Sequence, residues 1–187
     1  MNRLIIRILD VTFSCAGLVS LSPIIAVLLV INFIVFDGAP IFLQERIGRN
    51  GARFTIFKFR TLPISTPNVP SHELKLEKLS LYGKFLRLTK LDELPQLLNV
   101  LLGEMSLVGP RPCLPSQKEM IRLREAAGVL AIRPGITGLA QLKHIHMEFP
   151  DRVVELDREM QLNLDPVRYC KILLATVFQV VGLRGVR

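Results

Sequence analysis

The 26 residues from Val11 to Phe36 contain no charged side chain, and this run constrains the fold more than any other part of the chain. As one straight helix it would extend about 39 Å, whereas the hydrocarbon core of a bilayer is about 30 Å thick. Ser22 and Pro23 interrupt its centre, where proline removes a backbone donor and clashes with the preceding turn. Two arms of about 12 residues remain, and neither is long enough to cross a membrane alone.

We expect this run to form a re-entrant membrane helix, a helix-break-helix hairpin that enters one leaflet and breaks at Ser22 and Pro23. Arg3 and Arg7 precede the run and further arginines follow it, so the positive-inside rule favours the cytoplasmic side for both flanks. A spanning helix kinked at Pro23 is the alternative. A secretory signal peptide is less compatible with the sequence, because no A-x-A-like cleavage site follows the run.

The composition combines hydrophobicity with positive charge. In 187 residues, 24 Lys and Arg stand against 16 Asp and Glu, which gives a net charge of +8, and half of the residues are hydrophobic. Such a chain is not disordered, and it suits a partner that is an anionic membrane surface or carries phosphate. We expect no nucleic-acid partner, because the cations are dispersed and aromatic residues make up only 6%.

The cysteines are odd in number and widely spaced, so they form no disulfide framework. We interpret all three as buried thiols: Cys15, Cys113 and Cys170.

After the apolar run, the pattern predicts an α+β, mostly helical fold, with a membrane unit at residues 1–38 and a cytoplasmic domain at 39–187. Asn50 and Gly51 lie between two alternating segments, which predicts a small β-hairpin because both central residues of a type I′ turn need positive φ. The segments that follow are an irregular loop predicted over Leu62–Ser71 and a helical pattern that resumes at about His72.

A further helix is predicted to start no earlier than about Leu91, with Asp92 as its cap, and to end at Gly103. Its apolar residues recur at helical spacing and form one stripe: Leu94, Leu97, Leu98, Leu101 and Leu102. Amphipathic helices, some at the membrane interface, are expected at 114–131, 150–161 and 166–183, with loops shaped by proline and glycine at 105–112 and 133–141.

Asp92 and Glu93 are adjacent acids at a predicted helix start, near the cations of Arg87 and Arg111 in the sequence. Their ordinary interpretation is a helix cap and a first-turn glutamate. The chemical alternative is that nearby cations keep a carboxylate ionised, so that it acts as a nucleophile or holds Mg²⁺. The chain has no glycine-rich phosphate-binding loop, so phosphate binding would depend on cationic side chains. Lys58 leaves two interpretations open as well, a solvated strand face or a phosphate contact.

The chain resembles the bacterial sugar transferases, the monotopic phosphoglycosyl transferases that start glycan assembly on a polyprenyl phosphate carrier. The resemblance extends from about Arg3 to Val181. It rests on the Ser22-Pro23 break and on three motifs: KFRT at 58–61, LDELPQLLNVLLGEMSLVGPRP at 91–112 and RPGITGLAQ at 133–141. After GLAQ the chain departs from the family pattern with LKHIHMEF, so we expect its sugar specificity and membrane contacts to differ.

The resemblance implies a reaction in which a UDP-sugar gives its sugar 1-phosphate to polyprenyl (undecaprenyl) phosphate and UMP is released. It implies that Asp92 is the nucleophile, which forms a covalent aspartyl-phosphosugar intermediate and binds Mg²⁺. Glu93 is implied to be the partner acid of Asp92.

The resemblance also implies cations that contact the substrate phosphates, at Lys58, Arg87 and Arg111, with Arg60 and Arg133 as further candidates for substrate binding. The expected location is the cytoplasmic face of the bacterial inner membrane, with membrane lipid and downstream glycosyltransferases as further partners. The competing hypothesis is a basic, non-enzymatic membrane scaffold, in which Asp92 and Glu93 would be dispensable.

Overall fold

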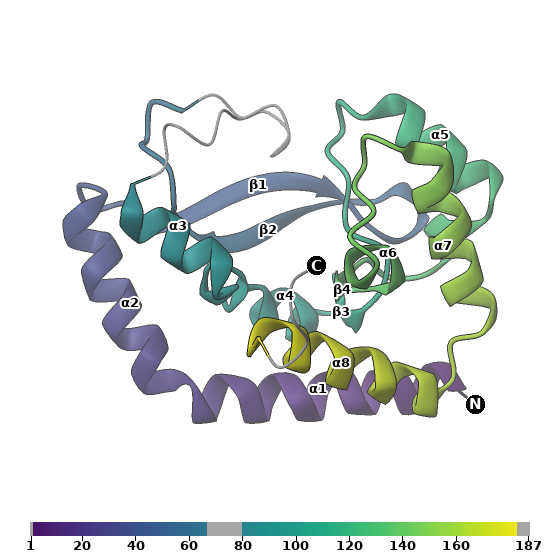
Figure 1. Ribbon diagram of the computed structural model, residues 1–187, viewed down its shortest axis with the longest axis horizontal. Helices are drawn as coiled ribbons and strands as arrows, with labels where there is room; N and C mark the ends of the chain where they lie inside the picture. The colour runs from purple at the N-terminus through teal and green to yellow at the C-terminus, as the bar shows by residue number, and fades with distance from the viewer. Residues whose placement is uncertain (1, 67–79, 183–187) are drawn as a thin grey trace.

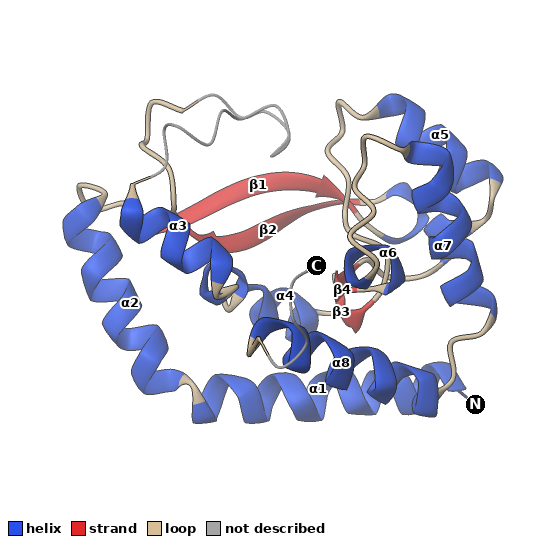
Figure 2. Cartoon of the chain, viewed as in Figure 1, coloured by secondary structure: helices blue, strands red, loops and turns tan. Residues whose placement is uncertain are grey.

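The computed structural model describes residues 2–66 and 80–182 of the chain. Helices predominate in this part, and two small two-stranded sheets accompany them, so the predicted α+β, mostly helical class is confirmed (Figure 2). The helical pattern predicted from His72 begins outside the described residues, as does the second half of the loop predicted over Leu62–Ser71.

The apolar run forms two helices, α1 (Asn2–Ser20) and α2 (Ser22–Val35), bent by 65° at the intervening residue. The predicted break is therefore confirmed, although the first arm is longer than expected. Pro23 has no N–H to donate to the carbonyl of Val19, four residues back, and the Ser22 hydroxyl donates to that carbonyl instead at 2.8 Å. Among the described residues no single helix has the length and composition to cross a membrane, while this bent pair has them jointly.

α1 is tied to the rest of the chain by a buried carboxylate. Asp10 is almost completely buried, and its Oδ1 accepts hydrogen bonds from Ser106 Oγ (2.8 Å), Leu107 N (2.9 Å) and Tyr169 Oη (2.7 Å). These donors lie on β3 (Ser106–Val108) and α8 (Pro166–Val180). One side chain therefore joins the first helix to a strand and to the last described helix, which lies beside α1 in Figure 1.

α2 is tied to the same body by Asn32, which is fully buried. Its Nδ2 donates to the carbonyls of Pro40 (2.9 Å) and Arg60 (3.0 Å), and its Oδ1 accepts from Tyr82 Oη (2.6 Å) on α3 (Leu81–Leu88). Both arms of the bent pair are therefore attached to one folded unit, as Figure 1 shows along its lower and left edges.

The predicted hairpin is confirmed. β1 (Ile41–Ile47) pairs antiparallel with β2 (Arg53–Phe59), and Asn50 and Gly51 in the connecting turn have φ of +56° and +76°. These positive values are the ones that the Asn-Gly pair accommodates with little strain.

α4 (Gln96–Leu102) closes the other edge of β2 through one side chain. Asn99 is fully buried; its Nδ2 donates to the Thr55 carbonyl (2.7 Å) and its Oδ1 accepts from the Phe57 N–H (3.0 Å). The helix ends at Gly103 in the left-handed conformation, as predicted. Beyond this end, Arg7 donates to the last carbonyls of α4 and so supplies a cation where the helix dipole is negative.

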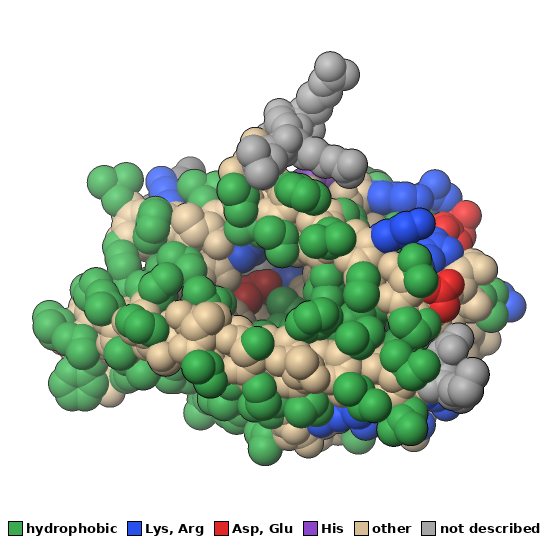
Figure 3. Space-filling view, turned by 90° about the horizontal axis from the view of Figure 1, so that it is seen from below, with side chains coloured by type: hydrophobic (Ala, Val, Ile, Leu, Met, Phe, Trp, Pro, Cys, Tyr) green, Lys and Arg blue, Asp and Glu red, His purple; other side chains and the backbone are tan. Residues whose placement is uncertain are grey.

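The leucine stripe of α4 does not pack wholly into the core. Gln96, Asn99 and Val100 are buried, whereas the side chains of Leu98 and Leu102 are 47% and 68% exposed. Hydrophobic side chains are spread widely over the face shown in Figure 3, which is the side on which α1 lies in Figure 1. Cys15, predicted to be buried, is exposed on α1; Cys113 is buried and Cys170 is half-buried.

The two segments predicted as loops contain short parallel strands, β3 and β4 (Gly135–Thr137). Their contact is very close: a Cβ on Gly135 would lie 2.0 Å from the backbone nitrogen of Gly109, so only glycine fits.

The amphipathic helix predicted at 114–131 is shorter in the structure. The remaining elements are α5 (Lys118–Ala126), α6 (Leu139–Leu142), α7 (Pro150–Leu162), and the 3-10 turns η1 (Arg49–Gly51), η3 (Leu91–Glu93) and η4 (Val129–Ala131).

We expect Asp10→Ala to destabilise the protein by about 3 kcal/mol or more, because three buried donors lose their acceptor and each costs about 1–3 kcal/mol. Tyr169→Phe removes one of these donors and should cost about 1 kcal/mol. The measurement is thermal unfolding of detergent-solubilised protein. Asp151→Ala, at an exposed position, is the control, and equal midpoints for it and Asp10→Ala would contradict the anchoring role.

Candidate active site

The acidic pair lies on the short 3-10 turn η3, between α3 and α4. Lys90 precedes the pair in the left-handed conformation (φ +59°), so the chain changes direction after α3. Pro95 follows the pair at the start of α4. Asp92 makes no capping hydrogen bond, so the prediction that it caps the following helix is wrong. The 3-10 turn, and not the first turn of an α-helix, presents the two carboxyl groups.

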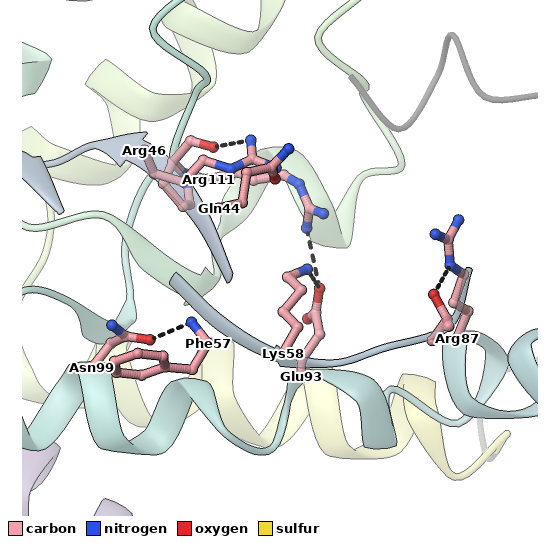
Figure 4. A network of polar contacts seen from close by, with 10 residues as sticks. Gln44, Arg46, Phe57, Lys58, Arg87, Glu93, Asn99 and Arg111 are labelled. Carbon is pink, nitrogen blue, oxygen red and sulfur yellow. Dashed lines mark hydrogen bonds and ion pairs between the residues drawn. The ribbon is translucent and has the colours of Figure 1, made fainter. Parts of the chain in front are cut away.

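Glu93 binds two cations from distant parts of the chain. Its Oε1 accepts from Lys58 Nζ at 2.8 Å and lies 3.6 Å from Arg111 Nη1. Lys58 and Glu93 are enclosed, with 14% and 11% of their side chains exposed, and Arg111 is more open at 36%. Figure 4 shows both cationic side chains converging on Glu93 from β2 and from the loop after β3. Lys58 therefore does not lie on a solvated strand face.

Asp92 differs from its neighbour in having an unused oxygen. The residue is only 7% exposed, and its Oδ1 is buried with no hydrogen-bond partner among the described residues. A buried, unpaired carboxylate oxygen carries a desolvation cost of about 1–3 kcal/mol or more, which makes it a candidate for a functional role.

The environment moves the pKa values of the two acids in opposite directions. Burial and the adjacent Glu93 raise the pKa of Asp92, and Lys58, Lys90 and Arg87 oppose that rise. Burial also acts on Glu93, but Lys58 and Arg111 hold the pKa of that carboxyl well below its usual range. We expected nearby cations to keep one carboxylate of the pair ionised, and in the structure they do so mainly for Glu93. Two adjacent acids with divergent pKa values are typical of catalytic sites.

Of the other predicted cations, Arg87 is near the acidic pair and two lie elsewhere. Arg87 donates to Thr61 Oγ1 at 3.0 Å and stands beside the Glu93 cluster in Figure 4, and its charge acts on both acids. Arg60 donates to the carbonyls of Ala39 and Ile41, and Arg133 donates to the carbonyl of Gly103 at 2.7 Å. Contact between substrate and either Arg60 or Arg133 stays a prediction.

The loop that carries Arg111 is fixed by two buried arginines. Arg124 on α5 donates to the Arg111 carbonyl at 2.7 Å and pairs with buried Asp157 on α7 at 2.7 Å. Arg46 on β1 donates to the Pro112 carbonyl at 3.0 Å (Figure 4). The backbone around Arg111 is therefore held from two sides, and this limits where its guanidinium can lie.

A cavity of about 660 Å³ opens beside the acidic pair. Glu93 and Arg111 line it, whereas Asp92, Lys58 and Arg87 are not among its lining residues. Figure 3 shows a hollow in the apolar face, with acidic and basic side chains at its floor. Further polar side chains also line the cavity: Gln117, Gln141, His144, His146, Glu148 and Gln179.

Sequence reasoning missed several of the charged residues in this cavity. Arg46, Lys90, Arg124 and Asp157 all line it. The sequence could have identified Lys90 as a candidate site residue, since it lies two residues from Asp92. Nothing in the sequence distinguishes Arg124 or Asp157 from an ordinary polar residue of an amphipathic helix.

The side chains fit Mg²⁺, which prefers oxygen ligands and keeps several waters or substrate oxygens in its shell. The Oδ1 of Asp92, which has no hydrogen-bond partner among the described residues, is an oxygen of this kind. The described residues contain no group of three His, Cys, Asp or Glu that forms an all-protein metal site. Asp92 would therefore hold the ion together with ligands that these side chains do not supply, and the ion would contribute positive charge beside the acidic pair.

The sequence comparisons place this site in a family. The profile described as "Bacterial sugar transferase" matches residues 1–183, so the chain belongs to the bacterial sugar transferase family. A UDP-glucose:undecaprenyl-phosphate glucose-1-phosphate transferase of Klebsiella pneumoniae is 34% identical over 95% of this chain and 40% of that protein. "Galactosyl transferase CpsE" of Streptococcus agalactiae is 37% identical over 81% of this chain and 36% of its own length.

A shorter relative is matched over more of its length. "Uncharacterized sugar transferase EpsL" of Bacillus subtilis is 37% identical over 80% of this chain and 74% of that protein. The chain spans about two fifths of the length of the first two relatives. The family membership therefore rests on the part of those proteins that corresponds to this chain.

Burial predicts an observable titration at Lys58. Desolvation lowers the pKa of its ammonium below the usual 10.5, and Glu93 opposes that shift. The ammonium should therefore lose its proton at a lower pH than an exposed lysine does. NMR of ¹³Cε-labelled lysine, with Lys58→Arg to assign the signal, measures this midpoint. Glu93→Gln should lower the midpoint further, because it removes a carboxylate that favours the charged form. A midpoint at or above 10.5 would contradict the burial of Lys58.

Proposed function

We propose that this protein is a membrane-associated phosphoglycosyl transferase that moves a sugar 1-phosphate from a UDP-sugar to polyprenyl (undecaprenyl) phosphate, with release of UMP. The observation that carries the proposal is that the two adjacent acids have different partners. Glu93 is occupied by Lys58 and Arg111, whereas the buried Oδ1 of Asp92 has no partner among the described residues. The activities named for the relatives support the same reaction class.

In the first step, a carboxylate oxygen of Asp92 forms a bond to the phosphorus that carries the sugar. The bond from that phosphorus to the bridging oxygen breaks, and the bridging oxygen leaves with UMP. An anion attacks an anionic diphosphate here, so charge repulsion must be offset by fixed cations. Lys58, Arg87 and Arg111 would supply this charge near the acidic pair, and Arg111 lines the cavity from a loop that Arg124 and Arg46 hold in place.

Asp92 would hold Mg²⁺ through its unpartnered oxygen. When bound, the ion supplies positive charge at the phosphoryl oxygens. The burial of Asp92 favours its neutral form, and a cation at this position would favour the ionised form that attacks.

In the second step, a phosphate oxygen of the lipid acceptor attacks the same phosphorus, and Asp92 is released as a carboxylate. Two steps let a water-soluble donor and a lipid acceptor use one site in turn. We further propose that the bent pair α1–α2 is re-entrant and that the protein is monotopic, on the cytoplasmic face of the inner membrane. The 65° bend and the attachment of both arms to one folded unit through Asp10 and Asn32 support this topology.

The reaction is tested by incubating the purified protein with a panel of UDP-sugars, Mg²⁺ and undecaprenyl phosphate. UMP should be released, and a phosphosugar adduct should be detectable on the intact protein by mass spectrometry before acceptor is added. Asp92→Asn should abolish the adduct and reduce turnover by about 10³-fold or more, because the nucleophile is lost. Release of UDP would identify an ordinary glycosyltransferase, and full activity in Asp92→Asn would remove Asp92 from this role.

The re-entrant topology is tested with Cys15→Ala as the background, because Cys15 is exposed. Single cysteines at Arg3 and Ala52, both exposed, stand before and after the bent pair. In oriented membrane vesicles an impermeant thiol reagent should label both positions from the same side. Labelling from opposite sides would establish a spanning arrangement.

A further inference from the structure

Most cations of the cavity are already engaged. Arg111 contacts Glu93, Arg124 pairs with Asp157, and Arg46 donates to the Pro112 carbonyl and to Gln44. Within residues 2–66 and 80–182, the Lys90 side chain is the lining Lys or Arg with neither an ion pair nor a hydrogen bond. An unneutralised ammonium at the cavity is available to an anionic ligand.

The backbone holds Lys90 at this place. Its φ of +59° lies in the left-handed region, which a lysine adopts at a cost of about 1 kcal/mol. This conformation turns the chain from α3 into η3 and sets Lys90 two residues before Asp92. The charge of Lys90 acts on both acids, where it favours their ionised forms.

The surface that leads to Lys90 is apolar. Leu81, Phe85 and Leu88 recur at i, i+4 and i+7 on α3, so they form one stripe, and they are 85%, 52% and 80% exposed. Leu88 also lines the cavity. An apolar stripe that ends at a free ammonium is complementary to a molecule with a hydrocarbon tail and a phosphate head.

We propose that Lys90 binds the phosphate of the lipid acceptor where it enters the cavity, with the start of its hydrocarbon chain along Leu88 and α3. This assignment rests on the proposed function and adds a residue to it. Lys90 would hold the acceptor phosphate beside the dyad for the second step. The water-soluble donor needs no apolar stripe, so donor binding should depend on this surface much less than acceptor binding does.

The test separates the two half-reactions of the full-length protein in detergent or nanodiscs. Lys90→Asn removes the charge but keeps a residue that tolerates the left-handed conformation. We expect its KM for the UDP-sugar to stay within twofold of wild type, whereas its single-turnover release of UMP should slow, because Lys90 favours the ionised form of Asp92. Its KM for undecaprenyl phosphate should rise about tenfold, the size expected for loss of a charged hydrogen bond. Lys90→Arg should restore the KM to within about threefold.

Lys84→Gln is the matched control, because Lys84 is an exposed lysine on α3 that does not line the cavity. Thermal unfolding of each variant establishes that it folds, and Lys90→Gly is a second uncharged variant suited to positive φ. The role of Lys90 is overturned if the acceptor KM of both uncharged variants stays within twofold of wild type, or if only the donor KM rises. A wild-type protein that releases no UMP would overturn the proposed function itself, and the role of Lys90 with it.

Discussion

The architecture of the site depends on the contact between the Glu93 carboxylate and two cations. Lys58 comes from β2, Glu93 from η3 and Arg111 from the loop after β3, so three separate segments must be in register for the pairs to form. An enclosed carboxylate without partners costs several kcal/mol. The Lys58–Glu93–Arg111 cluster thus positions the segments, and within residues 2–66 and 80–182 the adjacent Asp92 has no ion pair of its own. The role of nucleophile proposed for Asp92 therefore depends on Glu93, which binds the cations Lys58 and Arg111.

The features that the sequence predicted well are those that local chemistry decides. The hairpin follows from Asn50 and Gly51, which occupy the positive φ that its turn needs. The helix break follows from Pro23, and the end of α4 follows from Gly103. The motif residues Lys58, Arg87, Glu93 and Arg111 also come together as the family resemblance implied, although most of them are far apart in the chain.

The features that the sequence did not predict depend on non-local packing or on the surroundings. β3 and β4 are three residues each, and they form only because Gly109 and Gly135 allow two distant backbones to touch. Periodicity identified the apolar stripe of α4 but not its direction: Leu98 and Leu102 face outward while polar Gln96 and Asn99 are buried. Cys15 is exposed for the same reason, since it lies on a helix whose outer face is apolar. Hydrophobic spacing cannot distinguish a face that packs into the protein core from one that stays exposed.

The amide of Asn99 has a consequence for how the protein behaves among its own copies. A two-stranded sheet normally leaves both outer edges able to pair with another chain. On β2 the Thr55 carbonyl and the Phe57 N–H are already bound by Asn99, as a third strand would bind them. Strand addition at this edge is therefore blocked by a single side chain. For a protein that we expect to be concentrated on a membrane surface, such a block limits edge-to-edge aggregation without the need for a larger sheet.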